Sequence, residues 1–243
     1  MSYLKRGFYF LGVLFLSIIL SGCYSEQFGY PSDGSPMTKA ALTPFVNKTV
    51  EVLPFKDSRP ADSNTNMYVL WLIPPFPYGY GVYERPEKAD FFTSISDFKF
   101  DPAKDLARAA STSFQLSNIF NNVLYSNAPG DHKADYTMSG EIHSTQYTGR
   151  RFSYCSSFFT VIYWTLGAPL GTSYNRVALT VFLKDKSGNV IWQYSGDKDD
   201  YTVDWMYNPY DDCSMYPELT NQILNEAVMD LYNRALADPK LLN

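Results

Sequence analysis

Two runs of alternating apolar residues constrain the fold most strongly. Val177, Leu179, Val181 and Leu183 occupy every second position of residues 177–183, and Val190, Trp192 and Tyr194 do the same in residues 190–194. The Asp-Lys-Ser-Gly-Asn stretch at 185–189 between them is typical of a turn. Because side chains of a strand alternate between the two faces of a sheet, the runs predict an antiparallel hairpin with one buried face. The chain must therefore contain a sheet.

Two further strands and two helices are expected around this hairpin. Residues 50–55 favour a mostly buried strand that ends at Pro54, and residues 134–146 alternate with Tyr136, Met138, Gly140 and Ile142 on one side. Residues 101–117 begin with a capping Asp101 and then repeat small and apolar residues at helical spacing, as do residues 217–237. We expect an α/β (α+β) fold over residues 46–243, a single domain in which a mixed sheet has helices packed on it. Residues 61–97 lack a clear period and predict a long loop or insertion.

The first 22 residues have the organisation of an export signal. Lys5 and Arg6 precede the apolar stretch 7–20. That stretch is shorter than the about 20 apolar residues that a spanning helix needs, and it fits the about 7 to 15 of a secretory signal.

The residues that close this leader, Leu20-Ser21-Gly22-Cys23, resemble the lipobox of bacterial lipoproteins. The resemblance implies that residues 1–22 are a signal peptide and that Cys23 is acylated with fatty acids such as palmitate. An uncleaved anchor and an ordinary secreted protein are the alternatives. Tyr24 follows the cysteine, where an aspartate would signal retention in the inner membrane, so we expect lipid anchoring at the periplasmic face of the outer membrane. Residues 23–45 are rich in Gly, Pro and Ser and predict a flexible tether.

Two cysteines remain after the lipidated one. Cys155 and Cys213 would face an oxidising compartment, and both lie in turn-rich, tyrosine-rich stretches, so we predict a disulfide bond between them. The alternative is two buried free thiols. Neither has a His or a second Cys at ligand spacing, so a metal site is not expected.

Two insertions, residues 67–81 and 158–171, are almost free of charge and rich in aromatic residues. One interpretation is that they fold over the end of the sheet and bury one another. The other is an exposed apolar patch that contacts lipid or a partner protein, since Trp and Tyr favour such boundaries. The residues predicted to make that contact are Tyr68, Trp71, Leu72, Ile73, Phe76, Phe159, Ile162, Trp164 and Leu166.

The body of the chain also resembles a broad set of envelope lipoproteins. The resemblance is carried by residues 52–60 (Val-Leu-Pro-Phe-Lys-Asp-Ser-Arg-Pro), by Ile119-Phe120 after a helix, and by residues 134–142 (Ala-Asp-Tyr-Thr-Met-Ser-Gly-Glu-Ile). The set includes curli-secretion-type lipoproteins, outer-membrane activators of penicillin-binding proteins and the TolB amino-terminal domain. It implies an α/β sandwich that binds other envelope proteins. In curli-type channels such insertions form strands of an oligomeric barrel, so a homo-oligomeric secretion pore is the alternative.

The polar residues give little support to other functions. The chain has a net charge of −5 and no basic cluster, which argues against nucleic acid as a partner. The acidic run at Asp197, Asp199, Asp200, Asp204, Asp211 and Asp212 lacks the spacing of a calcium loop and is interpreted as a solvated loop. His132 and His143 lie in no catalytic motif, and Asp57 and Arg59 are expected to pair and fix a turn. We therefore expect a lipid-anchored periplasmic accessory or scaffold protein, with no metal, cofactor or catalysis; an envelope hydrolase that depends on His143 is the remaining alternative.

Overall fold

The computed structural model describes residues 28–29, 46–60, 64–89, 99–130, 133–207 and 215–242. The strands of these residues form one nine-stranded mixed sheet with the order β3-β4-β7-β8-β6-β1-β5, in which β2 also pairs with β6 and β9 with β8. The strands are β1 (Val46–Val52), β2 (Lys56–Asp57), β3 (Thr65–Met67), β4 (Tyr78–Tyr83), β5 (Phe120–Tyr125), β6 (Tyr136–Ser144), β7 (Tyr147–Phe152), β8 (Gly171–Lys184) and β9 (Val190–Asp204). The helices are α2 (Pro102–Leu116), α3 (Thr160–Thr165) and α4 (Met215–Ala237), with 3-10 turns η1 (Tyr68–Leu72), η2 (Pro86–Lys88) and η4 (Ser157–Phe159).

The β8–β9 hairpin is the longest element of the sheet. Its turn is held by Asp185, whose Oδ1 accepts hydrogen bonds from the backbone N–H groups of Ser187 (2.8 Å) and Asn189 (2.9 Å). Gly188 takes the positive φ (+84°) that the turn needs. The predicted hairpin is confirmed, but it extends from Gly171, paired with Asp204, to the turn.

The length of β9 corrects the interpretation of the acidic run. Asp197, Asp199, Asp200 and Asp204 lie on β9 and not in a loop, because the strand continues far beyond its apolar residues. Arg176 of β8 donates to Asp197 across the hairpin (2.6 and 2.9 Å). Opposite charges on paired strands thus supply the cross-strand contacts there. Asp211 and Asp212 lie outside the described residues.

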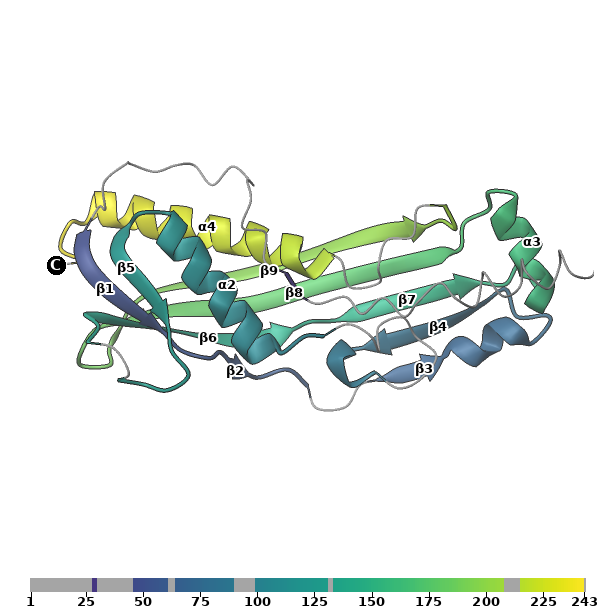
Figure 1. Cartoon of the computed structure of the whole chain (residues 1–243), viewed down its shortest axis with the longest axis horizontal. Coiled ribbons are helices and arrows are strands. Elements are labelled where there is room, and N and C mark those ends of the chain that lie inside the picture. Colours follow the sequence, from purple (N-terminus) through teal and green to yellow (C-terminus); the bar gives the residue numbers. More distant parts are fainter. Residues whose placement is uncertain are drawn as a thin grey trace, which may run out of the picture.

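The length of β8 divides the molecule into two halves. Its later residues pair with β6, which carries β1 and β5, while its earlier residues pair with β7, which carries β4 and β3. Helices α2 and α4 cover the half that contains β1, β5 and β6, and η1 and α3 lie at the opposite end (Figure 1). We call these the proximal half and the distal half.

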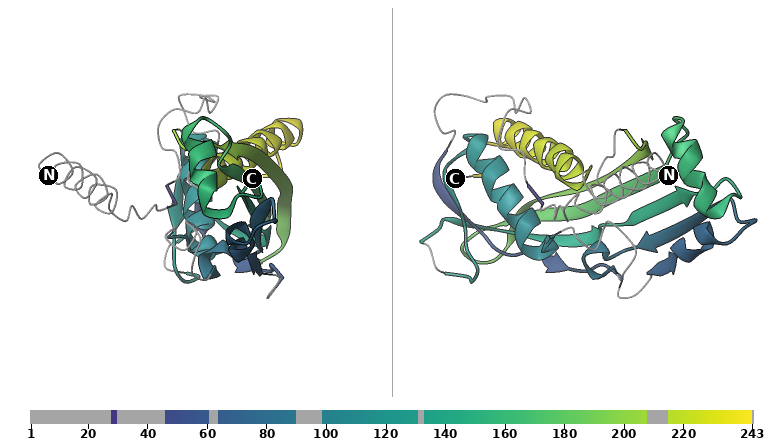
Figure 2. Two further views of the ribbon diagram at one scale, coloured as in Figure 1. Left: turned by 90° about the vertical axis from the view of Figure 1, so that its right-hand side faces the viewer. Right: turned by 45° about the vertical axis from the view of Figure 1, so that its right-hand side comes forward.

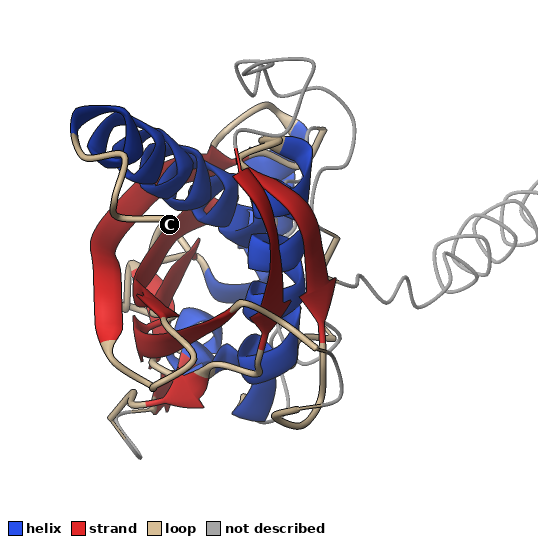
Figure 3. Cartoon of the chain, turned by 90° about the vertical axis from the view of Figure 1, so that its left-hand side faces the viewer, coloured by secondary structure: helices blue, strands red, loops and turns tan. Residues whose placement is uncertain are grey.

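The hydrophobic core lies in the proximal half, between the sheet and the two predicted helices, both of which are confirmed. Asp101 caps α2 by accepting from the N–H of Lys104 (3.4 Å), and the Phe114 ring meets Trp192 of β9 edge to face at 6.0 Å. Both helices lie on one face of the sheet (Figure 2), and the view from the proximal end shows them against the strands (Figure 3). Side chains with at most 2% exposure in this core include Leu106, Phe114, Trp192, Ile223 and Leu231.

The distal half contains strands where the sequence predicts a loop. Residues 65–67 and 78–83 form β3 and β4, so the expectation of irregular structure is wrong there. β4 has glycine at positions 79 and 81, and the absence of side chains there makes room for η1. A Cβ at Gly79 would lie 2.2 Å from the carbonyl oxygen of Tyr68, and one at Gly81 would lie 2.5 Å from the Tyr68 ring. Because Gly79 and Gly81 stand at two of the inward positions of β4, the strand lacks the alternation of apolar residues that would have predicted it.

Phe28 is packed on the body of the domain. Its backbone N–H donates to the carbonyl oxygen of Lys99 (3.1 Å), and its ring stacks on Phe100 at 5.0 Å. Phe100 in turn stacks on Tyr216 at 5.7 Å, and Phe28 is only 8% exposed. The interval predicted as a tether thus holds a residue that is docked on the domain.

Among the described residues, no helix has both the length and the apolar composition needed to cross a membrane. The apolar leader lies outside the described residues.

Candidate contact surface at the distal tip

The two apolar insertions meet at the far end of the distal half (Figure 1). Trp71 of η1 contacts Phe158 of η4 (6.1 Å between ring centroids) and Trp164 of α3 (6.1 Å). A third segment joins them after β9, where the Tyr207 hydroxyl donates to the carbonyl oxygen of Thr165 (2.6 Å). We call residues 68–78, 153–170 and 205–207 together the distal tip.

Hydroxyl groups hold the inside of the distal tip together. Ser157 donates to the carbonyl oxygen of Leu72 (2.5 Å), and Ser153 donates to that of Phe76, so each ties the second insertion to the backbone of the first. Thr160 donates to the carbonyl oxygen of Phe152 (3.3 Å). These hydroxyl side chains are at most 7% exposed. Since buried backbone carbonyls need donors, they fix a segment that has little regular structure.

The outside of the distal tip is apolar. Phe158, Phe159 and Leu166 are 70%, 73% and 80% exposed. Other exposed apolar side chains in the tip are Val69, Ile73, Phe76, Tyr78, Tyr154, Val161, Ile162, Tyr163, Trp205, Met206 and Tyr207. Polar groups inside and apolar groups outside reverse the distribution that water favours. Groups of exposed apolar side chains are typical of interaction sites.

The residues predicted as contacts have divided fates. Ile73, Phe76, Phe159, Ile162 and Leu166 are exposed, while Trp71, Leu72 and Trp164 are half-buried by the contacts between the insertions. Tyr68 lies inward, and its hydroxyl is 3.4 Å from that of Tyr147. The segments therefore pack on one another and still expose many apolar side chains, and contact of these side chains with lipid or a partner protein stays a prediction.

Residues 205–207 are the part of the tip that sequence reasoning missed. The Trp-Met-Tyr string is too short to show a period, and it follows an acidic run interpreted as a loop. The register of the hairpin places it, since Asp204 pairs with Gly171 and its carbonyl oxygen accepts from the N–H of Leu170 (2.7 Å).

Cys155, one of the two cysteines of the predicted disulfide, lies in the turn between β7 and η4. It is a free thiol, exposed to solvent, and takes a positive φ of 58° next to Tyr154 at 50°. The turn directs the chain back toward the first insertion and leaves the thiol at the surface. The structure therefore gives no support to a bond with Cys213, which lies outside the described residues.

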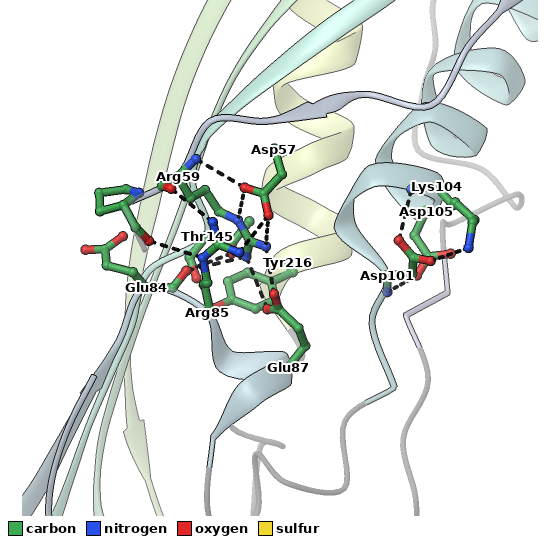
Figure 4. A network of polar contacts seen from close by, with 11 residues as sticks. Asp57, Arg59, Glu84, Arg85, Glu87, Asp101, Lys104, Asp105, Thr145 and Tyr216 are labelled. Atoms are coloured by element: carbon green, nitrogen blue, oxygen red, sulfur yellow. Dashed lines mark hydrogen bonds and ion pairs between the residues drawn. The ribbon is translucent and has the colours of Figure 1, made fainter. Parts of the chain in front are cut away.

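A second polar cluster, at the junction of the two halves, is built around Arg59 (Figure 4). Arg59 donates to both carboxylate oxygens of Asp57 (2.9 Å each), to both of Glu87 (2.7 and 3.1 Å) and to Thr145 (2.5 Å). Its side chain is 1% exposed. The predicted Asp57–Arg59 pair is confirmed. Each of these polar groups is hydrogen-bonded to another group of the cluster. The cluster therefore forms a fixed joint between the strand β2, the turn η2 and the corner between β6 and β7.

The stability of this joint should depend on pH. The hydrogen bonds from Arg59 lower the pKa of the Asp57 carboxyl from 3.8 to about 2. A carboxyl group whose pKa is lower in the folded state stabilises the fold above its unfolded pKa, and this stabilisation is lost as the pH falls through the folded pKa. We expect the free energy of unfolding to fall by on the order of 1 kcal/mol between pH 4 and pH 2 from this group, since the partly exposed carboxylate is screened by solvent. Urea unfolding of the wild type and of Asp57→Asn measures it; an equal fall in both would contradict the assignment.

His143 lies on the face of the sheet away from the helices. Its Nε2 forms a hydrogen bond with Thr180 Oγ1 (2.8 Å), and Thr180 contacts Ser195 (2.9 Å). Glu141, two residues before it on the same strand, is held by Lys56 (2.9 Å). His132 lies outside the described residues.

Comparison with known proteins yields structural likeness only. No protein-family model and no curated protein matches the sequence. Similar solved structures include a DUF330 protein from Xanthomonas campestris, with 12% identity over 85% of this chain and 90% of that chain and a TM-score of 0.42. A PelC variant from Paraburkholderia phytofirmans, described as a dodecamer, has 14% identity over 77% and 92% and a TM-score of 0.36. Lipoprotein GNA1162 from Neisseria meningitidis has 13% identity over 76% and 99% and a TM-score of 0.24. Likenesses this distant carry no inference about what this chain does.

Proposed function

We propose that this chain is a lipid-anchored accessory or scaffold protein at the periplasmic face of the outer membrane, and that it acts by contact and not by catalysis. The observation that carries the proposal is the distal tip, where hydroxyls are buried and Phe158, Phe159 and Leu166 are exposed. The lipobox at Cys23 supplies the anchor.

The distal tip adds little to the core of the domain. Helices α2 and α4 close the core over the proximal half, and the tip lies at the other end of the sheet. The exposed apolar side chains of the tip lower the solubility of the protein, and they add nothing to the packing of the core. A contact surface accounts for their exposure.

Acylation of Cys23 is the first prediction of this proposal. Cells fed a radioactive fatty acid should label the wild-type protein and should not label Cys23→Ser, because the thioether-linked lipid requires that thiol. Cys155→Ser is the matched control, since it removes an exposed thiol of the folded domain and should leave labelling intact. Equal labelling of the wild type and Cys23→Ser would contradict the proposal, as would an unlabelled wild type.

A further inference from the structure

We infer that the distal tip inserts into the surface of the same membrane that carries the lipid on Cys23. This inference rests on the proposed acylation and names the occupant of the proposed contact surface: a phospholipid bilayer. Four features of the described residues lead to it.

The first feature is the inverted polarity of the tip. Ser153 and Thr160 are fully buried at 0% exposure, and their hydroxyls take up backbone carbonyl oxygens. Backbone groups satisfied within the protein, with apolar side chains outside, are what an apolar solvent demands of a segment that enters it. An aqueous surface would favour the reverse.

The second feature is the kind of side chain at each level of the tip. The exposed apolar side chains of η4 and α3 are Phe158, Phe159, Val161, Ile162 and Tyr163, and Leu166 follows α3, while Tyr78 and Tyr154 lie at or next to the ends of β4 and β7. Aliphatic and Phe side chains prefer the hydrocarbon, whereas Tyr and Trp prefer the headgroup level. The tip thus exposes both kinds of side chain, those that suit the hydrocarbon and those that suit the headgroup level.

The third feature is charge. Residues 68–78 and 153–170 contain no acidic or basic side chain. Two arginines, Arg150 and Arg151, lie on β7 beside the tip, and the Arg150 guanidinium is 5.5 Å from the centre of the Tyr78 ring. Asp204, at the base of the tip, is 3% exposed and accepts a hydrogen bond from Ser173 (3.0 Å). Basic groups behind an uncharged tip suit the anionic headgroups of a bacterial membrane.

The fourth feature is the short distance between the lipid and the domain. Phe28 is docked through Lys99 and Phe100, and it follows Cys23 by five residues. A fully extended chain of that length spans at most about 18 Å. The acylated cysteine therefore holds the docking point of Phe28 close to the bilayer, which raises the effective concentration of the whole domain at that surface.

The shape of the tip favours a bilayer over a protein partner. The tip is the protruding end of an elongated molecule, with η1 on one side and α3 on the other (Figure 1). Protein interfaces of ordinary size rely on a buried centre surrounded by a polar rim. Here the apolar residues cover the end itself, as they do on elements that enter the interfacial layer of a membrane.

A fluorescent probe on Cys155 tests the inference in the intact, acylated protein. The thiol is exposed within the tip, so an environment-sensitive dye attached there, in a Cys213→Ser background, reports whether the tip enters lipid. The protein is reconstituted into vesicles of phosphatidylethanolamine and phosphatidylglycerol, with and without bromine on the acyl chains. We expect a blue shift, increased emission and quenching by brominated chains. The combined change of Phe158, Phe159 and Leu166 to serine should abolish that quenching.

Matched controls place the probe and the substitution at the other end. A dye on Leu236→Cys, in a Cys155→Ser and Cys213→Ser background, should stay unquenched, and Leu236→Ser should leave quenching at Cys155 unchanged; Leu236 is also exposed, at 52%. Circular dichroism verifies that each variant is folded.

Three outcomes of this experiment are distinguishable. An acylated, vesicle-bound protein whose Cys155 probe is not quenched would overturn the inference, while the proposed lipid anchor would remain supported. A blue shift without lipid quenching, dependent on protein concentration, would identify a second copy as the occupant and would overturn it too. Failure of acylation itself is read separately from fatty-acid labelling.

Discussion

Replacement of Arg59 by methionine is expected to lower the free energy of unfolding by about 3–5 kcal/mol, because Glu87 loses its buried cation and Asp57 keeps only its ion pair with Arg85 (3.1 Å). The Arg59 side chain is 1% exposed, while the Asp57 and Glu87 side chains keep 29% and 16%. Water can therefore reach the two carboxylates in part, and we expect the lower end of that range. Thermal or urea unfolding of the purified domain measures the loss.

A surface ion pair provides the control for this prediction. Arg176 and Asp197 form an equally short pair (2.6 Å), but their side chains are 40% and 53% exposed. Exposed pairs contribute at most about 1 kcal/mol, so Arg176→Met should cost no more than that. Adding Glu87→Gln to Arg59→Met should recover part of the loss, since the carboxylate that lost its ion pair is then neutral. Equal costs for Arg59→Met and Arg176→Met would contradict the role of the joint.

The proximal half could be predicted from the sequence because its elements carry complete periods. Asp101 and Pro102 mark the start of α2, and the alternation from Tyr136 to Ile142 and from Val177 to Leu183 gives β6 and the second half of β8. Each of these patterns arises from one element packed on one core. Local sequence is sufficient where burial is one-sided and regular.

The distal half could not be predicted in this way because its contacts are made between distant segments. Glycines at 79, 81 and 149 accommodate Tyr68, so the strands that carry them lack apolar alternation. The composition of the insertions indicated a contact surface, yet only the register of β8 with β9 brings residues 205–207 to it. The docking of Phe28 on Phe100 likewise joins segments about 70 residues apart in the sequence. A contact of this kind cannot be predicted from a local sequence pattern.

The proximal half also holds Phe28. Tyr216, in the first turn of α4, stacks on Phe100, which holds Phe28, and its hydroxyl donates to the carbonyl oxygen of Thr145 (2.9 Å). The packing of α4 on β9 therefore controls both the core and the docking of Phe28 on the domain. A substitution beneath α4 should therefore affect both the packing of the core and the docking of Phe28.

Gly196→Ala is expected to lower the free energy of unfolding by about 1–3 kcal/mol through overpacking beneath α4. A Cβ at Gly196 would lie 2.4 Å from Cγ2 and 3.0 Å from Cγ1 of Ile223. Ile is β-branched and stiff in a helix, so it cannot rotate away and α4 must shift instead. In an Ile223→Ala background the same change should cost far less, because the conflicting atoms are gone. Gln193→Ala, on the exposed face of the same strand, should cost less than about 0.5 kcal/mol. Urea unfolding of the four combinations at positions 196 and 223 gives the coupling; additive costs would show that α4 does not rest on this glycine.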